Sequence, residues 1–92
     1  LRMAMAGVQF KIMPTGPEVD LEVIKLAFNA KVEEMGGIPS NVEEQPIAFG
    51  LKALLFSFAY PEDKDVDQVN NAVNEIENVS SSEMVDYRRA LG

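Results

Sequence analysis

The side chains that most often carry out catalysis are missing from this sequence. It contains no cysteine and no histidine, which excludes thiol nucleophiles, zinc sites built on these residues and any serine–histidine pair. Three acidic pairs could act as general acids or bases: Glu33-Glu34, Glu43-Glu44 and Glu62-Asp63. Because neighbouring carboxylates on a surface segment are normally solvated, we assign no reaction to them. The sequence therefore favours recognition over covalent chemistry.

A short apolar run, Pro46-Ile47-Ala48-Phe49-Gly50, stands directly before the most apolar part of the chain. Two interpretations of this run are open. In the first, Phe49 packs into the core and Gly50 forms a bulge or a turn. In the second, Phe49 is an aromatic anchor, exposed at the end of a strand, that fills a pocket on a partner protein.

A second motif, Asp86-Tyr87-Arg88-Arg89, lies near the end of the chain. A charged segment of this kind is ordinarily a solvated edge strand. Its two adjacent arginines, however, are two of only eight basic residues in the sequence. The motif therefore stays a candidate site beside the solvated interpretation.

The overall charge limits the possible partners. Fifteen acidic residues against eight basic ones give a net charge of -7 and a pI of about 4.4. Such a surface repels phosphate backbones and anionic head groups, so we expect no direct binding to nucleic acid. The longest apolar stretch, residues 53–60, has eight residues and is interrupted only by Ser57, whereas a membrane helix needs about 20. The excess of acids provides solubility or steers the chain toward a basic partner.

The first half of the chain predicts a strand, a helix and a second strand. Residues 8–13 alternate between apolar and polar types and end at Pro14, as in a strand. Apolar residues at helical spacing over residues 21–35, with Asp20 as the N-cap, predict an amphipathic helix. Residues 39–45 begin at Pro39 and are followed by Pro46. They are interpreted as an edge strand, because both prolines lack the N–H that a central strand needs.

The second half of the chain repeats this order. Residues 50–60 are apolar on both faces, which is typical of a central strand. Asp65 can cap a second helix with Val66, Val69 and Ile76 on one face, and residues 78–82 break it. A last strand is expected over residues 83–89, with Val85 and Tyr87 on one side and Met84, Asp86 and Arg88 on the other.

The order strand, helix, strand, strand, helix, strand predicts an α+β fold of the ferredoxin-like split βαβ type (βαββαβ). Its four-stranded antiparallel sheet would carry both helices on one face, with the first and third strands in the centre. Residues 8–92 would form this single domain. Residues 1–7 are expected to be an N-terminal extension or a cloning remnant, with the native start at Met3 or Met5.

The motifs together resemble a known family. The run Pro46-Ile47-Ala48-Phe49-Gly50-Leu51-Lys52 is similar to the Pro-Ile-Gly/Ala-Phe-Gly-Ile/Leu-Lys signature of translation elongation factor 1-beta. The segments 11–14, 18–21, 62–64 and 86–89 resemble the archaeal, single-domain members of that family. The resemblance covers residues 8–89, and the family is ferredoxin-like.

This resemblance implies a guanine nucleotide exchange factor for elongation factor 1-alpha rather than an enzyme of covalent chemistry. It implies that Arg88 or Arg89 disturbs the magnesium site of the partner, and that Phe49 and Gly50, with Ile47 and Tyr87, dock onto it. The factor would have no metal or cofactor of its own, because GDP, GTP and Mg²⁺ are held by the GTPase. We expect a cytoplasmic protein, monomeric by itself, that binds neither nucleic acid nor membrane.

One alternative keeps the fold and changes the function. A ferredoxin-like module of the ACT type would bind a small ligand such as an amino acid, or would dimerise through its edge strands. Such a module favours a glycine-rich loop between the first strand and the first helix. Thr15-Gly16-Pro17 is a poor version of that loop.

Overall fold

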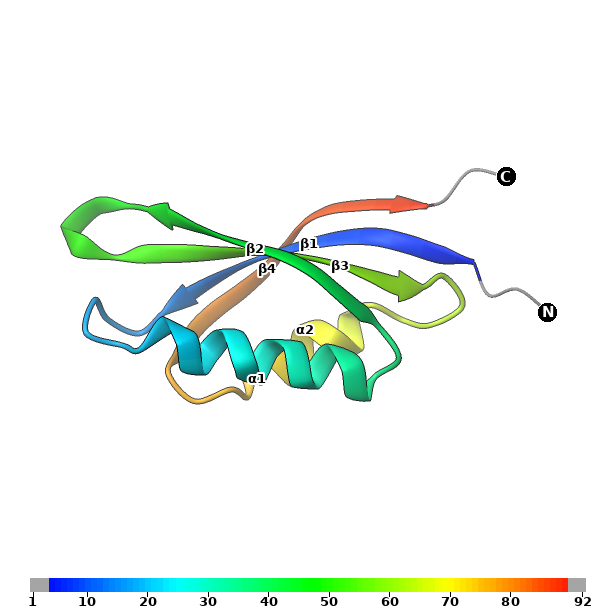
Figure 1. Ribbon diagram of the computed structural model, residues 1–92, viewed down its shortest axis with the longest axis horizontal. Coiled ribbons are helices and arrows are strands. Elements are labelled where there is room, and N and C mark those ends of the chain that lie inside the picture. Colours follow the sequence, from blue (N-terminus) through cyan, green and yellow to red (C-terminus); the bar gives the residue numbers. More distant parts are fainter. Residues whose placement is uncertain (1–3, 90–92) are drawn as a thin grey trace.

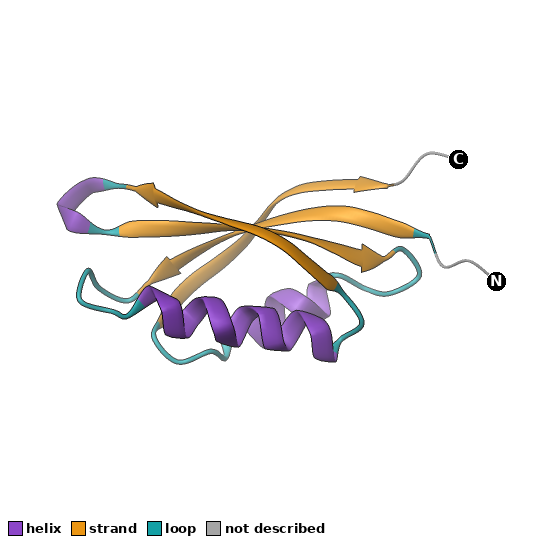
Figure 2. Cartoon of the chain, in the orientation of Figure 1, coloured by secondary structure: helices purple, strands orange, loops and turns teal. Residues whose placement is uncertain are grey.

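The computed structural model describes residues 4–89 of the chain, and the expected start at Met3 and the tail 90–92 lie outside this part. The elements follow the predicted order: β1 (Met5–Pro14), α1 (Leu21–Glu34), β2 (Ile38–Pro46), β3 (Lys52–Pro61), α2 (Asp67–Asn74) and β4 (Val79–Arg89). The strands form one antiparallel sheet in the order β2-β3-β1-β4. Both helices cover one face of it and leave the other open (Figures 1 and 2). The predicted ferredoxin-like architecture is confirmed.

The central strand β1 begins at Met5, three residues before the predicted start. Its inward side chains, Ala6, Val8, Phe10 and Ile12, are all buried. Ala6 lies opposite Tyr60 of β3 on one side and Arg89 of β4 on the other. Ala6 and Gly7 give only a weak strand signal. The strand is therefore extended here by pairing with β3 and β4 and not by local propensity.

The helices begin where their capping residues predict. The Asp20 carboxylate accepts the backbone N–H of Glu22 at 3.0 Å, at the start of α1. The Asp65 carboxylate accepts the N–H of Asp67 at 2.9 Å, at the start of α2. Each carboxylate satisfies a donor that the first turn of a helix leaves unpaired. The amphipathic spacing then turns the apolar side of each helix toward the sheet.

The core lies between the helices and the sheet and is rich in aromatic rings. Phe28 of α1 stacks on Phe56 of β3, with ring centroids 3.8 Å apart and an interplanar angle of 14°. Phe10 and Phe58 pack edge-on or tilted around this pair. All four rings are at most 2% exposed. Burial of these rings is the main contribution of the core to stability.

The edge strand β4 differs from its prediction in both length and alternation. It begins at Val79 instead of residue 83, directly after Asn78, whose φ of 70° turns the chain. Gln9 lies opposite Asp86 whereas Phe10 lies opposite Met84, so Val85 is an extra residue in a bulge. A bulge changes which face the following residues occupy. Placing Met84 on the side opposite Tyr87 was therefore wrong.

The molecule is elongated, measuring 47 × 21 × 18 Å. The β2–β3 hairpin projects at one end, and the ends of the described chain lie together at the other (Figure 1). Neither α1 nor α2 is long and apolar enough to cross a membrane. This long shape gives the protein two separate ends with which to contact a partner.

Candidate functional site

The tip of the β2–β3 hairpin is a single 3₁₀ turn, Ala48–Gly50. The Ile47 N–H donates to the Leu51 carbonyl oxygen at 2.8 Å and closes the turn. Phe49 and Gly50 have φ angles of 64° and 76°. A left-handed backbone is ordinary for glycine but uncommon for a bulky aromatic residue. The turn therefore holds Phe49 in a strained conformation, at a cost of about 1 to 3 kcal/mol.

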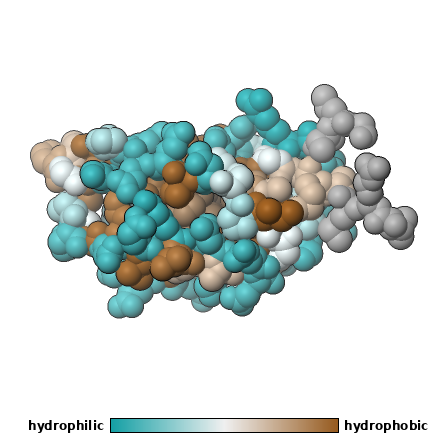
Figure 3. Space-filling model, viewed as in Figure 1, coloured by the Kyte–Doolittle hydropathy of each residue, from teal (hydrophilic) through white to brown (hydrophobic). Residues whose placement is uncertain are grey.

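The strained Phe49 side chain projects into solvent. It is 93% exposed, and Ile47 beside it is 43% exposed. The interpretation that packs Phe49 into the core is wrong, because the turn lies beyond the area that the helices cover. In the space-filling view, the hairpin end carries apolar colouring (Figure 3). An exposed aromatic ring on a rigid tip has the geometry of an interface anchor.

The root of the hairpin is fixed to α1 by ion pairs. Glu44 of β2 lies 2.9 Å from the Lys25 ammonium and 3.6 Å from that of Lys52, and Lys25 also reaches Glu22 at 2.8 Å. The hydrogen bonds that the Lys25 ammonium donates to Glu22 and Glu44 raise the pKa of Lys25. The hydrogen bond and charge of Lys25 lower the pKa of Glu44. These exposed pairs orient the hairpin more than they stabilise the fold.

Gly50 brings the hairpin close to the loop after β1. A Cβ atom at Gly50 would lie 3.7 Å from the Pro17 Cβ, which is ordinary contact, so its positive φ and not crowding favours glycine. A shallow hollow of about 120 Å³ lies between the two segments, beside Leu21 and Lys52. The loop that follows β1 therefore flanks the hairpin turn.

The two arginines lie at the opposite end of the sheet. The Arg88 Nε lies 3.0 Å from an Asp86 carboxylate oxygen, and Arg88 is opposite Gly7 on the open face. Arg89 is opposite the buried Ala6 and so lies on the helix-covered side. Within residues 4–89 Arg89 makes no ion pair. Arg88 is therefore held by its own strand, whereas the guanidinium of Arg89 remains open to a partner.

Tyr87 has a partly structural position. It lies opposite Val8 and packs, half-buried, against the core. Its edge strand nevertheless leaves part of the side chain exposed. Tyr87 can contact a partner only along this edge, unlike Phe49.

The structure does not bring the predicted site residues together. Phe49 lies just before the start of β3. Arg89 lies at the far end of the sheet, because both Arg89 and Tyr60, near the end of β3, are opposite Ala6 of β1. Tyr60 lies eight steps along the strand from Lys52, which corresponds to about 26 Å. A partner that touched both the hairpin tip and the arginine end would have to do so through separate regions.

The open face of the sheet carries a hollow that the sequence motifs did not indicate. It measures about 440 Å³ and is lined by Gln9, Ile38, Ser57 and Arg88 among others. The Gln9 amide donates to the Ser57 hydroxyl at 3.1 Å, and Ile38 is 60% exposed. In the sequence, the alternation of Gln9 and Ser57 with apolar residues is the signal for a polar second face. Between residues 4 and 89, no cluster of three or more carboxylates could hold a metal ion.

The sequence pattern of the EF-1 guanine nucleotide exchange domain matches residues 7–90 of the chain. This range includes the hairpin tip, both arginines and every described element except the first residues of β1. The match therefore spans both ends of the molecule.

Archaeal proteins resemble the chain over almost their full length. Elongation factor 1-beta of Methanococcus maripaludis strain C7 is 37% identical over 86 residues, covering 91% of this chain and 96% of the relative. That of Thermococcus gammatolerans is 41% identical over 81 residues, covering 86% and 88%. That of Methanosphaerula palustris is 34% identical over 85 residues, covering 91% and 95%.

Proposed function

The chain belongs to the EF-1 guanine nucleotide exchange domain family, and we propose that it promotes exchange of GDP for GTP on elongation factor 1-alpha during protein synthesis. The observation that carries the proposal is the separation of an exposed aromatic anchor from an open cation along one rigid sheet. Phe49 docks at one region of the GTPase, and the arginine end reaches the nucleotide site. The 93% exposure of Phe49 supports this arrangement.

The physical basis of exchange is a shift in nucleotide affinity. A GTPase of this kind holds its nucleotide through a phosphate-binding loop and Mg²⁺. A guanidinium brought near the ion competes with it by charge, which lowers the affinity for GDP and raises its rate of release. By linkage, the factor binds the nucleotide-free GTPase more tightly than the GDP-bound form. No bond is made or broken, which suits a chain without histidine or cysteine.

Arg89 is the better candidate for this cation. Its neighbour Arg88 is already paired with Asp86 on the open face. This pair holds the Arg88 side chain beside its own strand on the open face, whereas Arg89 lies on the other face and makes no ion pair within residues 4–89. Arg88 then contributes to docking, and its ion pair with Asp86 orients it at the edge of the open face.

The charge of the whole chain fits a protein partner and not a nucleic acid. A net charge of -7 steers the protein toward basic surfaces and raises the rate of encounter at low salt. The factor acts as a monomer in the cytoplasm, where translation takes place. It carries no cofactor of its own, because GDP, GTP and Mg²⁺ belong to the GTPase.

The test is release of a fluorescent GDP analogue from an archaeal elongation factor 1-alpha, with catalytic amounts of this protein. Acceleration that saturates with the added protein is expected. A folded protein that leaves release unchanged would overturn the proposal. In that case, amino-acid binding and dimerisation would be measured to test the ACT-type alternative, which the family match does not favour.

A further inference from the structure

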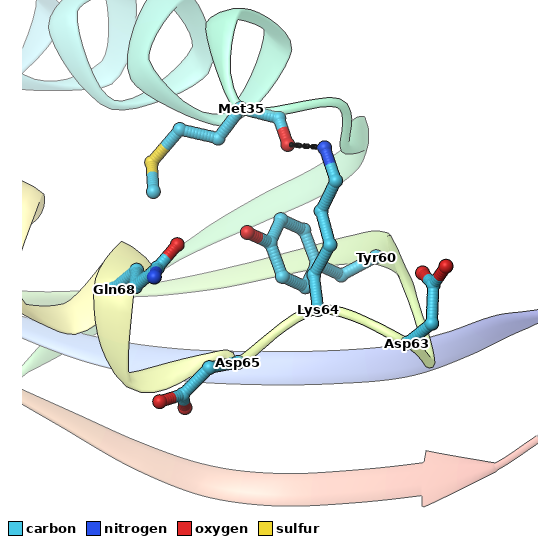
Figure 4. Close-up of a pocket in the computed structure, with 6 residues that line it drawn as sticks. All are labelled: Met35, Tyr60, Asp63, Lys64, Asp65 and Gln68. Carbon is cyan, nitrogen blue, oxygen red and sulfur yellow. Dashed lines mark hydrogen bonds between the residues drawn. The ribbon is translucent and has the colours of Figure 1, made fainter.

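A pocket of about 380 Å³ opens at the end of the molecule that carries the arginines. Figure 4 shows it between the end of α1, the loop after β3 and the start of α2. Its lining residues come from these elements and from the end of β3: Met35, Tyr60, Asp63, Lys64, Asp65 and Gln68. The volume is sufficient for one long side chain or a small ligand.

Tyr60 distinguishes this pocket from an ordinary surface hollow. The residue is 1% exposed, and its ring packs against Phe58 in the core. Its hydroxyl makes no hydrogen bond within residues 4–89. In the close-up, the hydroxyl points into the space beside Met35 and Gln68 (Figure 4). No buried side-chain N or O atom among residues 4–89 lacks a hydrogen-bond partner, so the Tyr60 hydroxyl is reached by solvent through the pocket and is available for a group that enters it.

The charges around the pocket favour a cation. Two of the lining residues, Asp63 and Asp65, carry carboxylates, and one carries an ammonium group. That ammonium, on Lys64, already donates to the Met35 carbonyl oxygen at 2.9 Å. Burial raises the pKa of the Tyr60 hydroxyl, and the charge of Asp65 raises it further.

The position of the pocket connects it to exchange. Ala6 of β1 pairs with Tyr60 of β3 on one side and with Arg89 of β4 on the other. Tyr60 and Arg89 therefore both lie on the helix-covered face of the sheet. Two strand spacings separate their backbones, about 10 Å. A partner that approaches Arg89 therefore meets this pocket as well.

We infer that the pocket receives an arginine or lysine side chain of the GTPase, with the cationic head on the Tyr60 hydroxyl and the Gln68 amide and the stem along Met35. This inference rests on the proposed function. The head group donates hydrogen bonds to two groups that have no partner among residues 4–89, and Asp63 and Asp65 supply the opposite charge. The pocket would fix the orientation of the partner while Arg89 reaches its nucleotide site.

The test compares the affinity of four proteins for the nucleotide-free GTPase by calorimetry. Tyr60→Phe removes the hydroxyl and keeps the ring, and Gln68→Lys places a competing cation in the pocket. Asn74→Lys makes the same change of charge at an exposed position on the same helix, away from the pocket. The unchanged protein is the fourth. Circular dichroism checks that each variant is folded.

Tyr60→Phe and Gln68→Lys are each expected to weaken binding by about tenfold or more, as expected for losing one hydrogen bond to a charged group or for placing like charges together. Asn74→Lys should weaken it much less. Equal effects of the two lysine variants would overturn the inference, and so would normal binding of Tyr60→Phe. Tighter binding of Gln68→Lys would show that the occupant is an anion, which also overturns it. Failure of the unchanged protein to bind would overturn the proposed function together with this inference.

Discussion

Arg88 and Arg89 are neighbours in the chain but lie on opposite faces of the sheet. Arg88 lies opposite Gly7 on the open face and is paired with Asp86 at 3.0 Å. Arg89 lies opposite Ala6 on the helix-covered face and makes no ion pair within the described residues. The two residues can therefore be tested separately.

Replacing Arg89 with alanine is expected to slow GDP release at saturating factor by about tenfold or more, because a close charged contact costs about 2 kcal/mol or more when it is removed. Arg88→Ala should have a smaller effect, and the double variant should be the slowest. Lys31→Ala, which removes a cation from α1, serves as the control. Unchanged release by the double variant would remove these arginines from the mechanism.

Replacing Phe49 with alanine should weaken binding to the GTPase by about 2 kcal/mol or more, as for an anchor residue. The free energy of unfolding should change by no more than about 0.5 kcal/mol, because the ring is 93% exposed. Calorimetry and urea unfolding measure the two effects. Normal binding by the folded variant would contradict the anchor role.

Phe49→Gly separates the strain in the hairpin from its function. Glycine accepts the φ of 64° without steric cost, whereas phenylalanine does not. We expect the free energy of unfolding to rise by up to about 1 kcal/mol relative to Phe49→Ala, with equally weak binding. A lower stability than that of the alanine variant would show that the turn is not strained.

The ion pairs at the hairpin root predict a small dependence of stability on pH. Lys25 lowers the pKa of Glu44 from its ordinary value of 4.5, so the pair stabilises the protein above that value. This contribution is lost as the pH falls through the lowered pKa of the folded state. Glu44→Gln should remove it and flatten the pH dependence in the acidic range that begins at the ordinary value of 4.5. Urea unfolding across this range checks the prediction, and an unchanged profile would contradict it.

The stacked pair Phe28 and Phe56 predicts the strongest effect on stability. Phe28→Ala leaves a cavity under α1 and should cost about 3 to 5 kcal/mol. Phe28→Leu fills part of that space and should cost less. Thermal unfolding followed by circular dichroism measures both, and a cost below about 1 kcal/mol for the alanine variant would contradict this description of the core.

The sequence by itself determined the elements and their order, because the signals for them are local. Alternation of Val8, Phe10 and Ile12 defines a strand at any place in a fold, and the spacing of Ile24, Phe28 and Val32 defines one face of a helix. Asp20 marks the start of that helix through a hydrogen bond over two residues. The split βαβ topology then follows from few allowed connections.

Only the tertiary structure decided where the functional side chains point. Phe49 suits a core and a surface equally well by type, and its exposure follows from a turn beyond the helices. The faces of Arg88 and Arg89 depend on pairing with β1 after the bulge at Val85, and the free hydroxyl of Tyr60 depends on elements distant in the chain. Periodicity acts between near neighbours, whereas register and burial are set by contacts between distant segments.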